Sequence, residues 1–240
     1  MRFGWFRAAI GAITAVVFFS AISGTPAHAE SASATSSAAS TVVAAGLDAA
    51  SWTGAALGGI DPNVFALALE SASSAVSRGL AAAPATLTVI DYSKPSTQPR
   101  MWVYDVRSHI LLFQELVSHG RGSGKTMATA FSNEAESNMT SLGLFRTGET
   151  YVGHNGYSLR LDGLERGVND HARERAIVIH GAPYVNAVTA KANGYLGRSL
   201  GCPAVRPDIA RKLIDSVKGG GLLFAYYPDQ SWLKSSDLLN

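Results

Sequence analysis

The sequence predicts a mainly β fold, a β-sandwich or barrel with a few added α-helices. From about residue 86 onward, apolar residues recur with a period of two in many short segments that Gly-rich turns separate. Two other segments carry apolar residues at helical spacing, each with proline at its first helical position. The 240 residues are 47% hydrophobic and 16% charged, which is enough for a sizeable core and too little charge for a disordered chain.

The first 29 residues are predicted to be a signal peptide. Arg2 and Arg7 form a basic start, residues 8–24 are uncharged and largely apolar, and Ala27-His28-Ala29 is the small-x-small pattern that precedes cleavage. A retained membrane anchor is the alternative, but an apolar run of 17 residues is at the short limit for a span. We therefore expect export to the periplasm or cell envelope, with no stable membrane span after cleavage.

Charge and cysteine usage exclude several classes of function. The formal charge of +2 falls to zero when Arg2 and Arg7 leave with the signal peptide, so we expect no basic surface for nucleic acid. The single cysteine, Cys202, can form neither an internal disulfide nor a Cys-cluster metal site. Export also makes nucleotide cofactors generally unavailable.

Residues 30–60 are predicted to be a flexible tether. Ala, Ser and Thr fill 15 of the 21 positions of 30–50, which lack aromatic residues. Such a segment buries too little apolar surface to offset the entropy of ordering it. An N-terminal helix follows over 61–85, with Asp61 as its N-cap and Pro62 at the first helical position. Its apolar face is expected to dock on the following domain.

The main domain is predicted over residues 86–228, with a C-terminal tail over 229–240. A polar turn at 107–109 between two alternating segments predicts a hairpin. A helix is expected to begin at Pro207 and to end before Gly219. The predicted strands are 87–92, 101–106, 110–117, 142–147, 150–153, 157–161, 176–180 and 222–227.

Two motifs suggest other chemistries. Residues 122–126 end like a phosphate-binding P-loop, but the full pattern needs glycine where His119 stands, and a Gly-rich loop between strands is the other interpretation. Residues 197–201 match the G-x-S-x-G nucleophile elbow around Ser199, in whose fold the histidine follows the serine; none follows here. Other serine hydrolases place the histidine first, so a Ser199 nucleophile stays open.

Cys202 and His180 form the strongest candidate catalytic pair. Gly201 permits a sharp turn before the cysteine, and Pro203 has no N–H, so backbone oxyanion donors would come from Cys202 and the residues just before it. His180 ends the apolar segment 176–179, where it can face a cleft while its backbone is held rigidly. A free thiol is only a few per cent thiolate at neutral pH and needs such a base. The alternative is a small buried cysteine and a core or edge histidine.

The other histidines are weaker candidates for the base. His28 leaves with the signal peptide, His109 lies in a turn, and His171 falls in a charged run. His119 and His154 lie beside glycines in loops, where they could line a substrate groove.

The order of several separated motifs resembles a known family. His180-Gly181 is followed by Ser199-x-Gly201-Cys202, and related segments occur over 131–133, 141–143, 156–164 and 197–205. Together they resemble the YkuD-type L,D-transpeptidases, exported cysteine enzymes that cross-link or remodel peptidoglycan, and especially the YkuD-like murein L,D-transpeptidase catalytic domain subgroup. The resemblance covers about residues 86–227 and implies the mainly β L,D-transpeptidase catalytic fold.

The resemblance also implies roles for individual residues. Cys202 would be the nucleophile, and His180 would be the base that activates it and later acts as acid. The backbone carbonyl of Gly181, or a group near it, would orient the imidazole, and Ser199 would shape the site by hydrogen bonding. Backbone N–H groups of Gly201 and Cys202 would stabilise the oxyanion.

The sequence departs from the broader family at two positions. Many members have histidine where Leu200 stands, and arginine where Ala204 stands two residues after the cysteine. Arg160, Arg198 and Arg206 are possible replacements for that arginine, with solvated surface arginines as the alternative. The candidate substrate contacts are Tyr157, Arg160, Arg198, His154 and His119.

The implied function is that of a peptidoglycan L,D-transpeptidase, with stem peptides as partners and neither a metal nor an organic cofactor. A Cys202 thioester would form as D-Ala leaves a tetrapeptide stem, and a neighbouring stem amine would then form a 3→3 cross-link. The same site would be an L,D-carboxypeptidase with water as acceptor, an L,D-endopeptidase with a cross-link as donor, or a protein-anchoring enzyme with a lipoprotein lysine as acceptor. A non-catalytic peptidoglycan-binding module is the alternative of another class.

Overall fold

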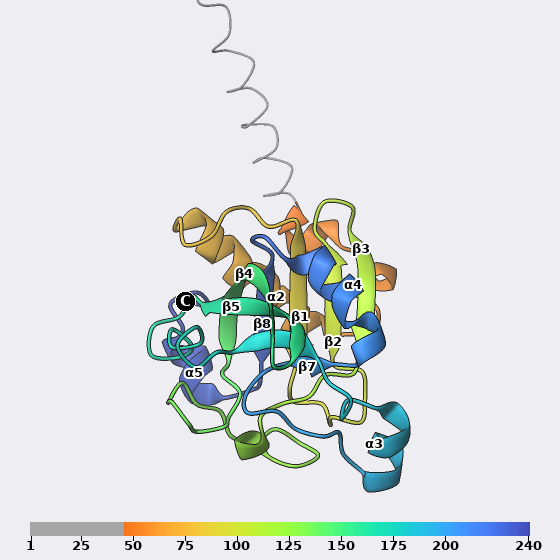
Figure 1. Ribbon diagram of the computed structural model, residues 1–240. Helices are drawn as coiled ribbons and strands as arrows, with labels where there is room; N and C mark the ends of the chain where they lie inside the picture. The colour runs from red at the N-terminus through yellow and green to blue at the C-terminus, as the bar shows by residue number, and fades with distance from the viewer. Residues whose placement is uncertain (1–45) are drawn as a thin grey trace, which may run out of the picture.

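A single mixed β-sheet organises the molecule. The computed structural model describes residues 46–240, so the predicted signal peptide over 1–29 and residues 30–45 of the predicted tether lie outside the described residues. Eight strands pair in the order β3-β2-β1-β8-β4-β5-β6-β7, with helices packed around them (Figure 1). The prediction of a mainly β fold with a few added helices is confirmed. No helix of the described part is long and apolar enough to cross a membrane.

Most of the predicted elements are present within a few residues of their predicted bounds. The segments 142–147 and 150–153 form one strand whose register shifts between Thr147 and Thr150. The strands are β1 (Thr86–Asp91), β2 (Met101–Asp105), β3 (Ile110–Glu115), β4 (Gly143–Gly153), β5 (Gly156–Gly163), β6 (Val178–Gly181), β7 (Ala204–Val205) and β8 (Leu222–Tyr226). The helices are α2 (Pro62–Ser77), α3 (Ala187–Asn193), α4 (Pro207–Val217) and α5 (Gln230–Ser235).

The central strands are buried on both faces of the sheet. Leu87 and Val89 of β1 join an apolar cluster with α2 and α5, whereas Ile90 joins a second cluster with α4. Since successive side chains of a strand point to opposite faces, the two clusters lie on opposite sides of the sheet. All six residues of β1 are buried for this reason. The second cluster also includes Leu159 of β5 and Ile179 of β6, so the strands near the predicted site rest on a packed core.

Residues 46–60, assigned to the tether from composition, pack against the sheet. The indole N–H of Trp52 donates to the carbonyl of Gly46 at 2.9 Å, and its ring meets the ring of Phe65 edge-on at 4.9 Å. The hydroxyl of Tyr104 donates to the carbonyl of Leu57 at 2.8 Å. The Ala/Ser-rich composition conceals these contacts because one buried tryptophan anchors the segment.

The C-terminal segment, predicted as a tail over 229–240, also docks on the domain. The buried carboxylate of Glu165 accepts hydrogen bonds from the backbone N–H of Leu144 at 2.7 Å, the indole of Trp232 at 3.0 Å and the hydroxyl of Ser236 at 2.7 Å. These three donors tie α5 to β4 through one side chain.

The last strands of the sheet bring the predicted site residues together. β5 pairs with β6 so that Ser158 lies opposite His180, and β6 pairs in parallel with β7 so that His180 lies opposite Ala204. A further bridge joins Gly120 to Ser199. The turn that carries Cys202 therefore lies between β6 and the loop that follows β3.

Candidate active site

Ser199 closes the turn that precedes Cys202. Its Oγ donates a hydrogen bond to the carbonyl of Cys202 at 2.7 Å and accepts one from the N–H of Gly201 at 3.1 Å. The residue is buried, and no histidine contacts its hydroxyl among the described residues. Ser199 is thus placed to shape the turn, the role that the resemblance implies, and no base activates it as a nucleophile in this structure.

Thr140 holds the same turn from the other side. Its Oγ1 donates to the carbonyl of Gly201 at 3.1 Å and accepts from the N–H of Gly120 at 3.0 Å. Gly201 has φ of 129°, and a Cβ atom at this position would lie 2.9 Å from the carbonyl oxygen of Met139. Both the backbone angle and the missing space require glycine before the cysteine.

The thiol of Cys202 is partly exposed and lies against the backbone at the start of β6. The thiol donates a hydrogen bond to the carbonyl oxygen of Ala176, with 3.6 Å between Sγ and the oxygen. Burial raises the pKa of the Cys202 thiol, while the N–H of Val178 and the charge of Arg175 act in the opposite direction. The thiol is therefore mostly protonated at neutral pH.

His180 is buried with one ring nitrogen engaged. Its Nδ1 lies 3.0 Å from the carbonyl oxygen of Gly181, so the neutral tautomer that donates this bond carries its lone pair on Nε2. Burial lowers the pKa of His180, partly offset by the Gly181 carbonyl, which favours the charged form. At neutral pH the ring is an uncharged base in a fixed orientation.

Cys202 lies two residues before β7, the strand that pairs with the His180 strand, but the two side chains are not hydrogen-bonded to each other. The register pairs His180 with Ala204, which follows Cys202 by two residues. Within the described residues the thiol donates to Ala176, and Nδ1 of the histidine faces Gly181. Catalytic hydrogen bonds are often long in a substrate-free site and tighten only when substrate binds.

One of the two predicted oxyanion donors is already engaged. The N–H of Gly201 donates to Ser199 Oγ, so it does not point toward a carbonyl that Cys202 would attack. The sequence could not predict this because it depends on the conformation of the turn, in which the hydroxyl of Ser199 competes for the N–H. The N–H of Cys202, which lies beside its own Sγ, is the remaining predicted donor.

His119, predicted to line a groove, lies inside the protein instead. It is fully buried, and its Nδ1 lies 2.7 Å from Nη2 of Arg100, which is also fully buried. Burial, together with the nearby Arg100 charge, lowers the pKa of His119 to about 4. Its carbonyl accepts from the N–H of Ser199 at 3.0 Å, so His119 supports the turn from behind.

Arg198 and His154 lie on the surface in different places. Nη1 of Arg198 donates to the carbonyl of Gly124 at 3.1 Å. Gly124 belongs to the P-loop-like segment and follows a short 3-10 turn over Arg121–Ser123. His154 is exposed in the two-residue turn between β4 and β5. Of these two, only Arg198 adjoins the Cys202 turn in the chain.

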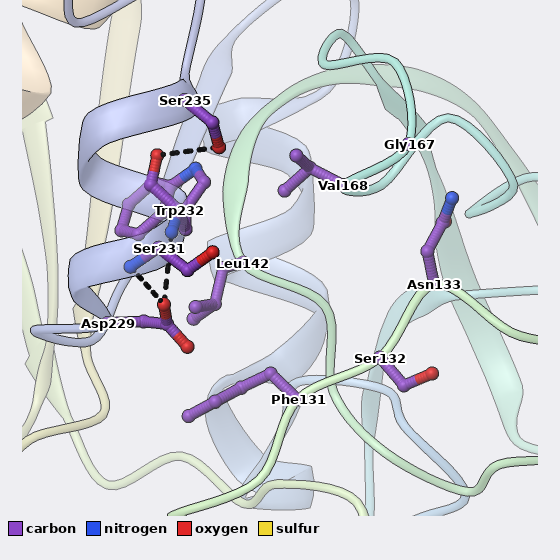
Figure 2. A pocket seen from close by; sticks show the side chains of 10 residues that line it. All are labelled: Phe131, Ser132, Asn133, Leu142, Gly167, Val168, Asp229, Ser231, Trp232 and Ser235. Carbon is purple, nitrogen blue, oxygen red and sulfur yellow. Dashed lines mark hydrogen bonds between the residues drawn. The ribbon is translucent and has the colours of Figure 1, made fainter.

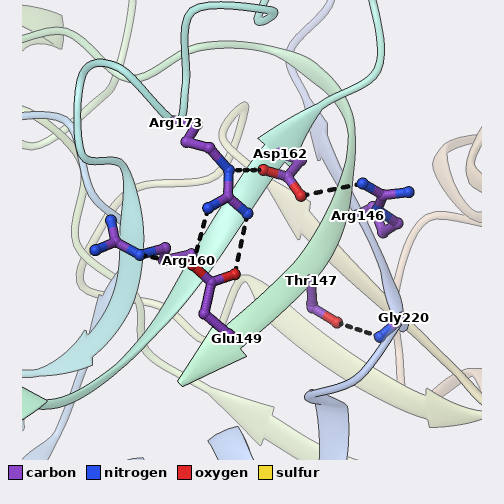
Figure 3. Close-up of polar contacts among 7 residues, drawn as sticks. All are labelled: Arg146, Thr147, Glu149, Arg160, Asp162, Arg173 and Gly220. Atoms are coloured by element: carbon purple, nitrogen blue, oxygen red, sulfur yellow. Dashed lines mark hydrogen bonds and ion pairs between the residues drawn. The ribbon is translucent and has the colours of Figure 1, made fainter. Parts of the chain in front are cut away.

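Tyr157 and Arg160, the other predicted substrate contacts, have protein partners. The hydroxyl of Tyr157 donates to Asp215 of α4 at 2.8 Å, on the sheet face opposite to that of His180. Arg160 forms an ion pair with Glu149 at 3.0 Å. Figure 3 shows this pair as part of an exposed network in which Arg173 joins Glu149 to Asp162.

Arg206, another predicted replacement for the family arginine, is also occupied. It pairs with Glu115 of β3 at 2.9 Å and with Asp208. Sequence reasoning missed a different arginine, Arg175, whose guanidinium lies beside Gly201. Nothing in the charged run 171–175 distinguishes it from its neighbours, because its burial depends on a loop more than thirty residues earlier in the chain.

A separate hollow opens between α5 and two loops. Figure 2 shows Trp232 and Ser235 on one side, with Asn133 and Val168 on the other. Ser132 also lines it, and its carbonyl accepts from Arg175. The hollow therefore shares a loop with the surroundings of Cys202, although neither Cys202 nor His180 lines it.

The family of the chain follows from its sequence. The sequence model of the L,D-transpeptidase catalytic domain matches residues 57–226, so the chain belongs to that family. The family that the sequence motifs predicted is confirmed. Within residues 46–240, no group of three His, Cys, Asp or Glu side chains could hold a metal ion.

Solved structures with a similar arrangement are also L,D-transpeptidases. An L,D-transpeptidase from Mycobacterium smegmatis is 15% identical, with 60% of this chain and 59% of that chain covered and a TM-score of 0.38. One from Xylanimonas cellulosilytica is 20% identical, with coverage of 60% and 61% and a TM-score of 0.34. L,D-transpeptidase 1 of Mycobacterium tuberculosis is 16% identical, with coverage of 60% and 62% and a TM-score of 0.35. The match thus spans about 60% of each of these relatives. No curated protein matches the chain.

Proposed function

We propose that this protein is an exported peptidoglycan L,D-transpeptidase that acts through a thioester on Cys202. One observation supports this proposal most directly. His180, oriented by the carbonyl of Gly181 at 3.0 Å, lies on the strand next to the one that Cys202 leads into. A neutral imidazole in that position is the base that a thiol nucleophile needs.

The acylation half of the reaction uses both residues. The thiol turns from the Ala176 carbonyl toward His180, whose Nε2 takes its proton, and the thiolate attacks the carbonyl carbon of the third stem residue. The N–H of Cys202 stabilises the oxyanion of the tetrahedral intermediate. The C–N bond to D-Ala then breaks, and the imidazolium of His180 protonates the leaving amine. A thioester on Cys202 remains.

The second half transfers the acyl group to an amine. His180, neutral again, takes a proton from the amine of a neighbouring stem as that amine attacks the thioester. Collapse of the intermediate expels the Cys202 thiolate and leaves a 3→3 cross-link. Reprotonation of the thiolate by His180 returns the site to its starting state.

The acceptor decides between closely related activities. Water in place of the stem amine gives L,D-carboxypeptidase activity, a cross-link as donor gives L,D-endopeptidase activity, and a lipoprotein lysine as acceptor gives protein anchoring. Since the same Cys202 and His180 serve all of these, product analysis is the discriminating measurement.

The proposal predicts that Cys202→Ala abolishes turnover. The mature protein is incubated with purified tetrapeptide muropeptides, and products are followed by liquid chromatography and mass spectrometry. Wild-type protein is expected to form dimers that lack one D-Ala, and the variant to lose at least about 10³-fold of this activity while keeping its circular dichroism spectrum.

Matched variants make the result specific. Ser199→Ala should retain part of the activity, because the hydroxyl shapes the turn and does not attack substrate. Tripeptide monomers alone would move the assignment to carboxypeptidase. Normal turnover by folded Cys202→Ala protein, with loss in Ser199→Ala, would replace the proposal with a serine hydrolase.

A further inference from the structure

The side chain of Arg175 is held by one loop through four hydrogen bonds. Its Nη1 donates to the carbonyl of Ser132 at 2.8 Å and to the hydroxyl of Ser141 at 2.5 Å. Its Nη2 donates to the carbonyl of Met139 at 2.6 Å and to the hydroxyl of Ser137 at 3.2 Å. All four partners are neutral, so these contacts fix the guanidinium without cancelling its charge.

Arg175 forms no ion pair among the described residues, unlike two of the arginines considered above as replacements for the family arginine. Arg160 pairs with Glu149, and Arg206 pairs with Glu115 and Asp208. Within residues 46–240, no carboxylate lies within ion-pair distance of Arg175; the acid that acts on it, Glu134, is exposed on the same loop. Because no nearby anion neutralises this half-buried cation, its positive electrostatic potential extends to the groups around it.

The Arg175 guanidinium lies close to the turn that carries Cys202. A Cβ atom built on Gly201 would lie 3.5 Å from Nη2 of Arg175, so the guanidinium lies beside the residue that precedes the nucleophile. The next residue in the chain, Ala176, accepts the hydrogen bond of the Cys202 thiol at 3.6 Å. The dipeptide 175–176 thus contacts the nucleophile turn through both a side chain and a backbone carbonyl.

The backbone at this dipeptide is held in an unusual conformation. Ala176 has φ of 54°, which is rare for a residue with a Cβ atom. The N–H of Ile177 donates to Ala172 and that of Ala176 to Arg173, the pattern that closes a helical turn with a left-handed residue. This strained residue directs its carbonyl to the thiol while Arg175 reaches the far side of the turn.

We propose that Arg175 is a positioning residue for the transpeptidase reaction, which holds a permanent positive charge beside Cys202 and fixes the loop 132–141 against the nucleophile turn. The effect on turnover rests on the proposed function, whereas the effect on the thiol does not. In this chain Arg175 would supply the positive charge that Ala204 cannot.

The charge of Arg175 acts on the thiol pKa against the effect of burial. Tyr92, Tyr184 and His180 surround Cys202 from the strands and loops packed against it, and Arg100 lies behind the Tyr92 ring at 5.0 Å. Burial raises the pKa of the thiol, and Arg175 lowers it. Removing the positive charge should therefore raise the pKa of the thiol further, and the thiolate fraction at neutral pH should fall.

The test is the pH dependence of alkylation of Cys202 by iodoacetamide in the full chain. Because the chain has one cysteine, the rate reports on Cys202 alone. Arg175→Gln should move the midpoint of the pH–rate profile upward by about one unit. The rate at pH 7 should fall only about three-fold, since a thiolate of higher pKa is intrinsically more nucleophilic.

Two further variants separate charge from structure. Arg175→Lys keeps the charge and should retain a midpoint close to that of the wild type. Ser137→Ala removes one contact of the guanidinium and keeps the charge, so it should leave the midpoint unchanged. An unchanged midpoint in Arg175→Gln, or equal shifts in all three variants, would overturn the proposal. If the alkylation midpoints shift as expected but the wild-type protein does not transpeptidate, only the proposed function is contradicted.

A surface variant keeps the test available if Arg175→Gln does not fold. Glu134 is exposed and acts on Arg175 across the loop, so Glu134→Lys should fold normally. It should lower the midpoint by a few tenths of a unit at low ionic strength, because it replaces a negative charge with a positive one on the loop that holds Arg175. A midpoint that does not move would contradict an electrostatic role of this cluster.

Discussion

The environment of Cys202 has opposing effects on the ionisation of its thiol. Burial disfavours the thiolate, whereas the backbone N–H of Val178 and the guanidinium of Arg175 favour it. In the mechanism that we propose, His180, neutral through its own burial, is the proton acceptor. A thiol of this kind would be unreactive in the resting protein and would be activated when substrate aligns it with the base.

The buried His119 predicts how the stability of the fold depends on pH. Its pKa is about 4 in the folded protein and near 6.5 when unfolded, so acid favours the unfolded state. The stability that this group contributes is complete above pH 6.5 and is lost as the pH falls toward 4, up to about 3 kcal/mol. Urea unfolding between pH 4 and pH 8 measures this loss.

His119→Gln is the matched variant, because an amide oxygen can still accept from Arg100. The free energy of unfolding of this variant should depend less on pH over the same range. The remaining slope is due to His180 and, near pH 4, to carboxylates such as Glu149, whose pKa values are also lowered. Parallel slopes for wild type and variant would contradict the assignment.

Individual residues differ in how well the sequence could predict them. Cys202 and His180 are the one cysteine and the histidine at the end of an apolar strand, so their positions follow from local patterns. The capture of the Gly201 N–H by Ser199 and the placement of Arg175 depend on the conformation of two loops. The burial of His119 depends on Arg100, nineteen residues away.

Secondary-structure elements were predictable where both periodicity and end signals were present. α2 and α4 each begin with proline at the first position, and the β2–β3 hairpin follows from its polar turn. β7 has only two residues and α3 only seven, too short for a period to be detected. α5 lies in a segment whose polar composition hides the buried Trp232.

The docking of α5 predicts a large cost for losing one carboxylate. Glu165→Ala would leave the N–H of Leu144, the indole of Trp232 and the hydroxyl of Ser236 without their acceptor. We expect a loss of about 2–4 kcal/mol in the free energy of unfolding, together with faster proteolysis near the C-terminus. Glu149→Ala, which removes an exposed carboxylate, should change stability only slightly. Equal effects of the two substitutions would show that α5 is not held by Glu165.

At the scale of the whole molecule, both ends of the described chain are part of the domain. Residues 46–60 cover the β2 side of the sheet, and residues 229–240 cover the β4 side. The family match over 57–226 includes neither residues 46–56 nor residues 227–240. Composition alone does not reveal this packing, because single tryptophans anchor each end.

The N-terminal packing predicts that Trp52 stabilises the fold. Its ring lies against Phe65, Tyr104 and His109 with centroid distances of 4.9, 5.4 and 4.7 Å. Trp52→Ala should reduce the free energy of unfolding by about 3–5 kcal/mol, measured by urea denaturation of the full chain. The exposed neighbour Thr53 provides the control, since Thr53→Ala should have little effect. A Trp52→Ala protein as stable as the wild type would mean that residues 46–60 behave as a tether in solution.

The most direct test of the central claim is intact-protein mass spectrometry after brief exposure to tetrapeptide muropeptides. Our account predicts a covalent adduct with the mass of the stem acyl group lacking D-Ala. Peptide mapping should place this adduct on Cys202, and hydroxylamine should release it as a thioester. An adduct on Ser199, or turnover by Cys202→Ala protein, would contradict the account.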